Sequence, residues 1–204
     1  MNKAGNGQKI SVLPKMRRTK KAAEWFFLVL CAVAAGVGLN AVVSCLELWR
    51  LSGAYVQVRE SQYAVPVLEG ILRYGLFFPV LEELLFRGIG YRLLARWFPW
   101  QAAMVLSALL FGLYHGNLIQ GGYAFVMGLL LAYMYRVFQS FAAPVVFHGA
   151  ANLAVFLLSY SPGTIPDVAL PVVGVIGCSL AAAIVCRFVR AEISDRQEFT
   201  DTVP

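Results

Sequence analysis

The residues of this chain that could carry out acid–base chemistry lie inside apolar segments. Both histidines, His115 and His148, are in such segments, and a third apolar segment contains Glu82, Glu83 and Arg87. Inserting an ionisable side chain into a membrane helix costs roughly 2.5–3.5 kcal/mol, so such groups are rare there and usually serve a site. We therefore expect these five side chains to belong to one functional site.

The acidic pair and the arginine have helical spacing. Glu83 and Arg87 are four residues apart and face each other on a helix, so each can lower the cost of burying the other. Glu82 is rotated by about 100° from Glu83, which leaves one carboxylate to face a different group. The alternative, a solvated acidic pair at a helix end, fits poorly with the leucines on either side.

The segment of His115 follows that of Glu82 across a short turn. Glu82 lies sixteen residues before Phe98, and His115 lies sixteen residues after Pro99, where the proline ends a helix. An antiparallel helical hairpin that turns here places Glu82 and His115 at the same depth on neighbouring helices.

Small residues surround His115. Gly112 and Gly116 are four apart, a spacing that allows close helix packing in membranes. Because Gly116 and Asn117 follow His115 directly, the histidine could instead cap a helix end.

His148 and Asn152 are also four apart, so their side chains lie on one helix face. Both can donate hydrogen bonds, and two donors directed into a dry cavity can stabilise an oxyanion. Hydrogen bonding between helices is the alternative role.

At these positions the chain resembles the CAAX protease and bacteriocin-processing (CPBP) family, glutamate-type intramembrane endopeptidases related to the type II CAAX prenyl endopeptidase. The resemblance covers about residues 66–160. Its three motifs occur in the family order and in separate apolar segments: Glu82-Glu83-x-x-x-Arg87, Phe111-x-x-x-His115 and His148-x-x-x-Asn152.

The resemblance implies a role for each motif residue. Glu82 is expected to activate water, His115 to help hold that water, and His148 with Asn152 to form the oxyanion hole. We expect these four side chains to converge on one water-filled cavity that opens to the cytoplasmic side.

Glu83 and Arg87 are expected to support the site, and no cofactor is expected. Two histidines and two glutamates could bind zinc, but the chain has no HExxH motif and asparagine is a poor zinc ligand. The implied partners are a peptide or membrane-protein substrate and membrane lipid, with no nucleic acid.

The composition predicts an all-α, polytopic membrane helix bundle. Hydrophobic residues make up 59% of the 204 positions and charged residues only 14%, and apolar stretches of about 20 residues are typical of membrane spans. We predict about six of them: Trp25–Leu46, Pro66–Gly88 with an amphipathic extension to Phe98, Gln101–Gly116, Gly122–Val137, Phe141–Tyr160 and Val168–Phe188.

The basic residues predict the orientation, because they favour the cytoplasmic side of a membrane. If the six spans alternate, most basic residues fall at one face: Lys3, Lys9, Lys15, Arg17, Arg18, Lys20, Lys21, Arg92, Arg96, Arg136, Arg187 and Arg190. We therefore expect a multi-pass protein of the cell (inner or plasma) membrane with both termini in the cytoplasm.

The short linkers indicate one domain without internal repeats. We expect a basic cytoplasmic tail at 1–22, an intramembrane protease domain at 23–190 with its core at 66–160, and a cytoplasmic tail at 191–204. Two other functions fit part of the pattern: a non-catalytic membrane protein that binds a partner, of the bacteriocin-immunity or regulatory type, and a proton-coupled carrier. Carriers usually show an inverted repeat, which is not visible here.

Overall fold

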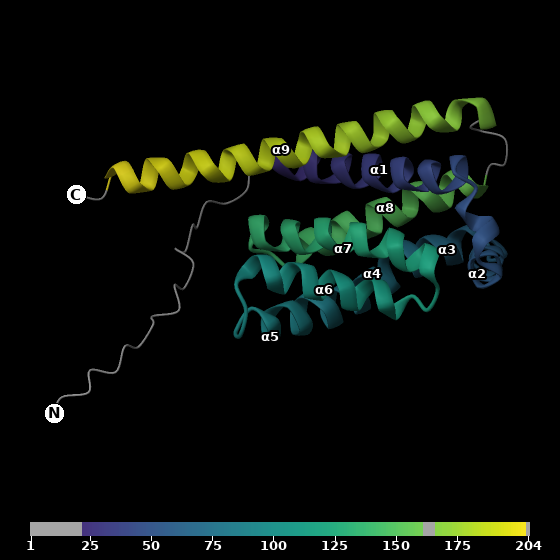
Figure 1. Cartoon of the computed structure of the whole chain (residues 1–204), viewed down its shortest axis with the longest axis horizontal. Coiled ribbons are helices and arrows are strands. Elements are labelled where there is room, and N and C mark those ends of the chain that lie inside the picture. The colour runs from purple at the N-terminus through teal and green to yellow at the C-terminus, as the bar shows by residue number, and fades with distance from the viewer. Residues whose placement is uncertain (1–21, 161–165, 203–204) are drawn as a thin grey trace.

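A bundle of helices contains all the apolar segments (Figure 1). The computed structural model describes residues 22–160 and 166–202, and within these ranges it has no strand. The predicted all-α fold is confirmed. Five long helices follow the predicted segments: α1 (Ala22–Cys45), α6 (Trp100–Tyr114), α7 (Leu118–Phe138), α8 (Ala142–Tyr160) and α9 (Leu170–Thr202).

The segment that carries Glu82 is a single rod with two π-helical stretches. It consists of α3 (Val67–Leu72), a π-helical segment (Arg73–Phe77), α4 (Phe78–Glu83), a second π-helical segment (Leu84–Tyr91) and α5 (Arg92–Leu94). Insertions of this kind into α-helices are frequent at functional sites.

A short helix precedes this rod and lies across one end of the bundle. It is α2 (Gly53–Tyr63), which bends from the rod by 112° and follows a 3₁₀ turn at Leu48–Leu51. Its residues are mostly polar, so its neighbours, not a hydrophobic stripe, must hold it in place. In Figure 1 it lies at the opposite end of the bundle from the C-terminal end of α9.

Glycines allow α1 to pack closely against two neighbouring helices. An added Cβ on Gly38 of α1 would lie 2.7 Å from the backbone nitrogen of Cys178 in α9, and one on Gly36 would lie 3.1 Å from the carbonyl of Ala151 in α8. α1 therefore lies between α8 and α9. The core beneath it is built from Leu28, Phe111, Leu131, Met134 and Phe147, all nearly or wholly buried.

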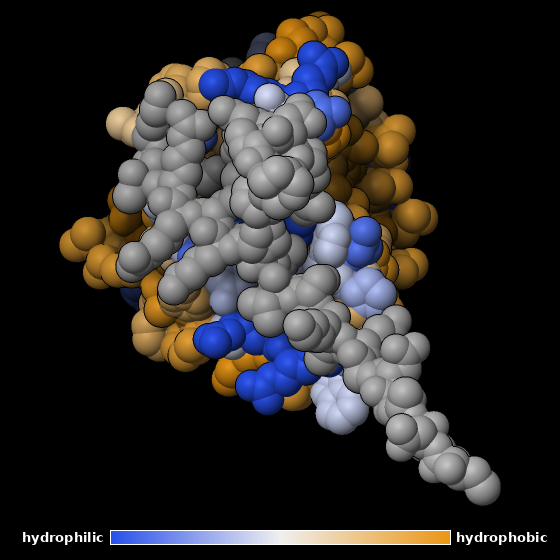
Figure 2. All heavy atoms as spheres, turned by 90° about the vertical axis from the view of Figure 1, so that its left-hand side faces the viewer, coloured by the Kyte–Doolittle hydropathy of each residue, from blue (hydrophilic) through white to orange (hydrophobic). Residues whose placement is uncertain are grey.

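The surface is that of a multi-pass membrane protein. Among the described residues, four helices are long and apolar enough to cross a membrane: α1, α7, α8 and the helical stretch Asp167–Ser194, which contains most of α9. The bent pair of α2 with the Val67–Leu94 rod could form a fifth span, whereas α6 is shorter at 15 residues. The predicted number of six is thus approximate. Figure 2 faces the end of the bundle where α9 terminates and shows hydrophilic side chains at that end, with hydrophobic side chains on the flanks.

Some sequence expectations fall outside the described residues. They include the lysines and arginines of residues 1–21 and most of the 161–167 loop. Residues 191–202, expected as a tail, continue α9 as helix.

Candidate active site

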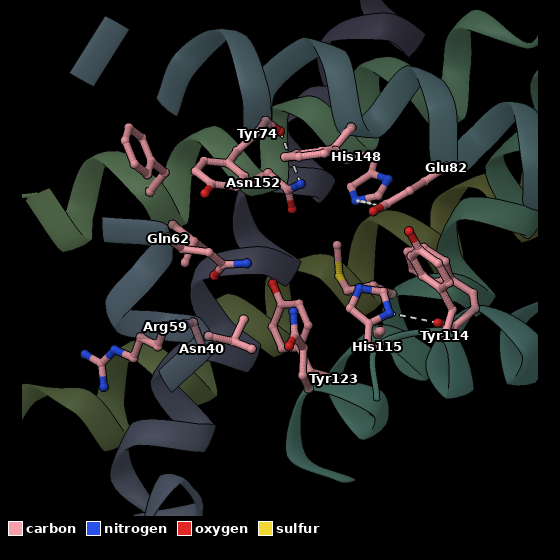
Figure 3. A pocket seen from close by; sticks show the side chains of 18 of the residues that line it. Asn40, Arg59, Gln62, Tyr74, Glu82, Tyr114, His115, Tyr123, His148 and Asn152 are labelled. Atoms are coloured by element: carbon pink, nitrogen blue, oxygen red, sulfur yellow. Dashed lines mark hydrogen bonds and ion pairs between the residues drawn. The ribbon is translucent and has the colours of Figure 1, made fainter. Parts of the chain in front are cut away.

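The four expected reactive side chains line one cavity. Its volume is about 400 Å³, within the range typical of ligand sites. Glu82 enters from α4, His115 from the end of α6, and His148 and Asn152 from α8. Figure 3 shows Glu82 and His148 side by side, with His115 facing them and Asn152 farther along the same wall as His148.

The helical hairpin has the register predicted from its turn. Phe86 packs edge-to-face on Phe111 with ring centroids 5.1 Å apart, and Ser107 Oγ donates to the carbonyl of Phe86 at 3.1 Å. Glu82 lies four residues before Phe86, and His115 lies four residues after Phe111. The same register therefore brings both residues to the cavity.

Arg87 and Glu83 form a wholly buried ion pair beneath the cavity. Arg87 Nη1 donates to Glu83 Oε1 at 2.8 Å, and both side chains have 0% exposure. Arg87 Nη2 also donates to the carbonyl of Gly128 in α7 at 3.0 Å, and its guanidinium lies 4.6 Å from the centre of the Phe111 ring. The predicted pairing is confirmed, and it joins the rod to α6 and α7.

His148 lies between the two carboxylates. Its Nδ1 is 2.9 Å from Glu83 Oε1, and its Nε2 is 3.6 Å from Glu82 Oε2. Glu83 Oε1 accepts from Arg87, and Nδ1 of His148 donates to the same oxygen, so Nδ1 carries a hydrogen. Nε2 is then the ring atom that faces Glu82 Oε2. The contact between these two atoms is attractive when one of them carries a proton.

His115 is held by its own helix. Its Nδ1 is 2.8 Å from the carbonyl oxygen of Phe111, which can only accept, so Nδ1 donates and Nε2 of the neutral ring is an acceptor. The helix ends here because Gly116 adopts φ 72°, a left-handed conformation. An added Cβ on Gly116 would meet no atom within 4 Å. The expectation that Gly116 packs against a neighbouring helix was therefore wrong, whereas Gly112 does pack closely against Gly121 of α7.

Asn152 donates a hydrogen bond to a backbone carbonyl in the π-helical stretch of the rod, where a proline removes a backbone donor. Its Nδ2 donates to the carbonyl of Tyr74 at 3.2 Å. In this π-helical stretch the N–H of Phe78 bonds to Arg73, and Pro79, the next residue, has no N–H. Asn152 replaces the missing backbone donor with one of its two N–H groups, and the second N–H remains for the cavity.

Residues outside the three motifs form the outer part of the cavity lining. They are mostly polar and come from three places: Asn40 of α1; Tyr55, Val58, Arg59 and Gln62 of α2; and Gln120 and Tyr123 of α7. The sequence analysis predicted no site residue in α2, which lies between the first two predicted spans.

The cavity extends from Glu82 and His148, near mid-depth, toward the α2 end of the bundle, where α1 and α8 end and α7 begins. Arg92, Arg96, Arg136, Arg187 and Arg190 mark the opposite end. The α2 part of the lining is thus away from these arginines, and the expected opening of the cavity to the cytoplasmic side stays a prediction. The motifs establish which residues meet, but not which end of the bundle leads to them.

Metal ligation is not evident from the arrangement of side chains. Within residues 22–160 and 166–202, no group of three or more His, Cys, Asp or Glu side chains could hold a metal ion. His148 is instead bonded through Nδ1 to Glu83, and His115 through Nδ1 to its own helix.

Comparison with protein families gives one match. The model of the family described as "Type II CAAX prenyl endopeptidase Rce1-like" matches residues 64–154. This range includes the rod, α6, α7 and the part of α8 that carries His148 and Asn152. No curated protein and no solved structure matches the chain.

Proposed function

Because residues 64–154 belong to the Rce1-like family of type II CAAX prenyl endopeptidases, a family of proteases, we propose that this protein is an intramembrane endopeptidase that hydrolyses a peptide bond with water activated by Glu82. Its substrate is a membrane-associated or C-terminally tagged peptide or protein. The observation that carries the proposal is the convergence of Glu82, His115, His148 and Asn152 on one cavity.

Water activation needs two acceptors that face each other. Glu82 supplies a carboxylate, and His115 supplies Nε2, since its Nδ1 is engaged by the carbonyl of Phe111. A water between them donates one hydrogen to each, so its lone pair is directed at the substrate carbonyl carbon. During attack, Glu82 takes one proton from the water as a general base.

The oxyanion that forms needs donors. The second N–H of Asn152 is available on the cavity wall. His148 adds a donor from Nε2 when protons lie on both of its ring nitrogens, because Nδ1 already donates to Glu83. Preorganised donors in a site that excludes water stabilise such charge strongly. When the C–N bond breaks, the proton held by Glu82 passes to the leaving amine. Each proton taken from the water is thereby accounted for without a metal ion.

Glu83 and Arg87 position these groups. Glu83 fixes a hydrogen of His148 on Nδ1, and Arg87 holds the carboxylate of Glu83 in place. Among the hydrogen bonds of the described residues, none joins Glu82 to Arg87. Glu82 is therefore the carboxylate of the pair that faces the cavity.

We place both termini on the cytoplasmic side of the cell membrane, because the arginines at the ends of the rod, α7 and α9 lie at one end of the bundle. Lipid surrounds the apolar flanks, and no nucleic acid is involved.

The test compares membranes from cells that make the wild-type protein or Glu82→Gln at equal abundance. New peptide termini are catalogued by mass spectrometry. We expect a set of termini that requires Glu82, and identical catalogues would show that this protein cleaves nothing by this route.

A further inference from the structure

Glu82 and His148 lie near mid-depth in the bundle, and the polar part of the cavity wall extends from them toward one end. Asn40 is near the C-terminal end of α1, Gln120 is in the first turn of α7, and Val155 lies late in α8. The same end is tied together by Tyr160 at the end of α8, whose hydroxyl donates to the carbonyl of Val65 at 3.0 Å. A substrate therefore reaches Glu82 past α2 and the turn between α6 and α7.

The two ends of the bundle differ in charge. The end away from the cavity carries Arg92 and Arg96 in and after α5, Arg136 at the end of α7, and Arg187 and Arg190 in α9. Figure 2 shows this end with its hydrophilic side chains. The basic residues at positions 3–21 precede the start of α1, which lies at the same end.

At the cavity end, arginines are fewer: Arg50, Arg59 and Arg73. Pairing with acids occurs at both ends, since Arg50 bonds to Glu47 and Arg73 to Glu69 at the cavity end, and Arg136 pairs with Glu192 at the other end. Positive residues near the ends of spans stay in the cytoplasm, so the arginine-rich end is cytoplasmic and the cavity end faces the other compartment.

From these observations we infer that the active site opens to the extracytoplasmic face, and that its substrates are peptide segments on that side: exported peptides, or stretches of membrane proteins just outside the membrane. This inference rests on the proposed function for its substrate class. The sidedness of the cavity does not depend on it.

The outer wall has the chemistry to bind an extended peptide. Asn40, Gln62 and Gln120 offer amides, and Tyr123 offers a hydroxyl, beside the apolar side chain of Val58. Amides both donate and accept hydrogen bonds, as the N–H and C=O groups of a peptide backbone require. Only Arg59 among the lining residues of α2 is charged, and it lies at the edge of the cavity (Figure 3).

Sidedness can be measured without any substrate. The four cysteines (Cys31, Cys45, Cys178 and Cys186) are changed to alanine, and the resulting protein is first shown to reach normal abundance. Single cysteines are then placed in this background and treated with a membrane-impermeant maleimide in intact cells.

Gln62→Cys probes the cavity wall, Ala54→Cys the exposed side of α2, and Ala95→Cys the loop at the arginine-rich end, where Ala95 is exposed and no charge is altered. We expect the first two to react in intact cells and Ala95→Cys to react only after permeabilisation. Labelling of Ala95→Cys in intact cells, with Gln62→Cys protected, would overturn the inference.

The substrate class is tested separately. We expect termini that require Glu82 to map to exported peptides or to the extracytoplasmic parts of membrane proteins. If they map to cytoplasmic sequences, the substrate inference is wrong although the protein is a protease. If labelling gives the expected pattern and no such termini exist, the proposed function fails while the sidedness of the cavity stands.

Discussion

Removal of the Arg87 charge should damage the fold more than removal of any exposed arginine. Arg87→Met leaves the carboxylate of Glu83 at 0% exposure without its cationic partner. Stranding one member of a buried ion pair costs about 3–5 kcal/mol. The bond to the carbonyl of Gly128 and the contact with Phe111 are lost as well. With about 2–4 °C per kcal/mol for a chain of this size, the melting temperature should fall by roughly 6–20 °C.

The chain contains a matched control for this experiment. Arg73 and Glu69 have the same four-residue spacing on the same rod, but their side chains are 51% and 39% exposed. Exposed ion pairs contribute about 0–1 kcal/mol, so Arg73→Met should shift the melting temperature by only a few degrees, by the same conversion.

A double variant separates the stranded charge from lost packing. In Glu83→Gln/Arg87→Met no buried charge is left unpaired, and the glutamine oxygen can still accept from Nδ1 of His148. Replacing both members of a buried pair is often nearly neutral, so most of the lost stability should return. The assay is thermal unfolding of purified protein in detergent. Equal melting temperatures for Arg87→Met and wild type would refute the reasoning, as would a double variant no more stable than Arg87→Met.

Three further predictions follow from contacts around the site and between helices. Asn152→Ala should lower the cleavage rate about 10²–10³-fold and Asn152→Asp should lower it more; adding Pro79→Ala restores a backbone donor, so regained activity in the double variant would mean that Asn152 only anchors the backbone. His115→Ala should abolish cleavage at normal abundance, and retained cleavage would remove His115 from water binding. Gly38→Leu should reduce thermal stability by about 1–3 kcal/mol through overpacking against α9, whereas Gly122→Leu, with nothing within 4 Å of an added Cβ, should be tolerated; equal stability of the two would contradict the close packing of α1 and α9.

Local spacing was enough to predict the parts of the site that depend on helix geometry. The four-residue interval between Glu83 and Arg87 determines their pairing, and the short turn at Pro99 sets the depth of Glu82 relative to His115. Both follow from the fixed rise and rotation of a helix, so no knowledge of the remaining fold was needed.

The parts that depend on contacts between distant segments were not predictable. α2 is a polar helix whose place over the cavity is set by the end of α8 and by the 112° bend, neither of which its sequence encodes. The bond from Asn152 to Tyr74 depends on a π-helical stretch that places Pro79, which has no N–H, where a backbone donor would be needed. The end of the bundle that carries the cavity likewise depends on how the helices assemble.

The central claim is that Glu82 activates water without a metal ion. The most direct measurement is the single-turnover cleavage rate of a peptide found by terminus mapping, with purified wild-type protein and Glu82→Gln, before and after exhaustive chelation. Glu82→Gln preserves the shape of the side chain and removes its basicity. We predict full wild-type activity after chelation and no measurable cleavage by Glu82→Gln. Wild-type activity that is lost on chelation and restored by stoichiometric zinc, or substantial cleavage by Glu82→Gln, would contradict the account.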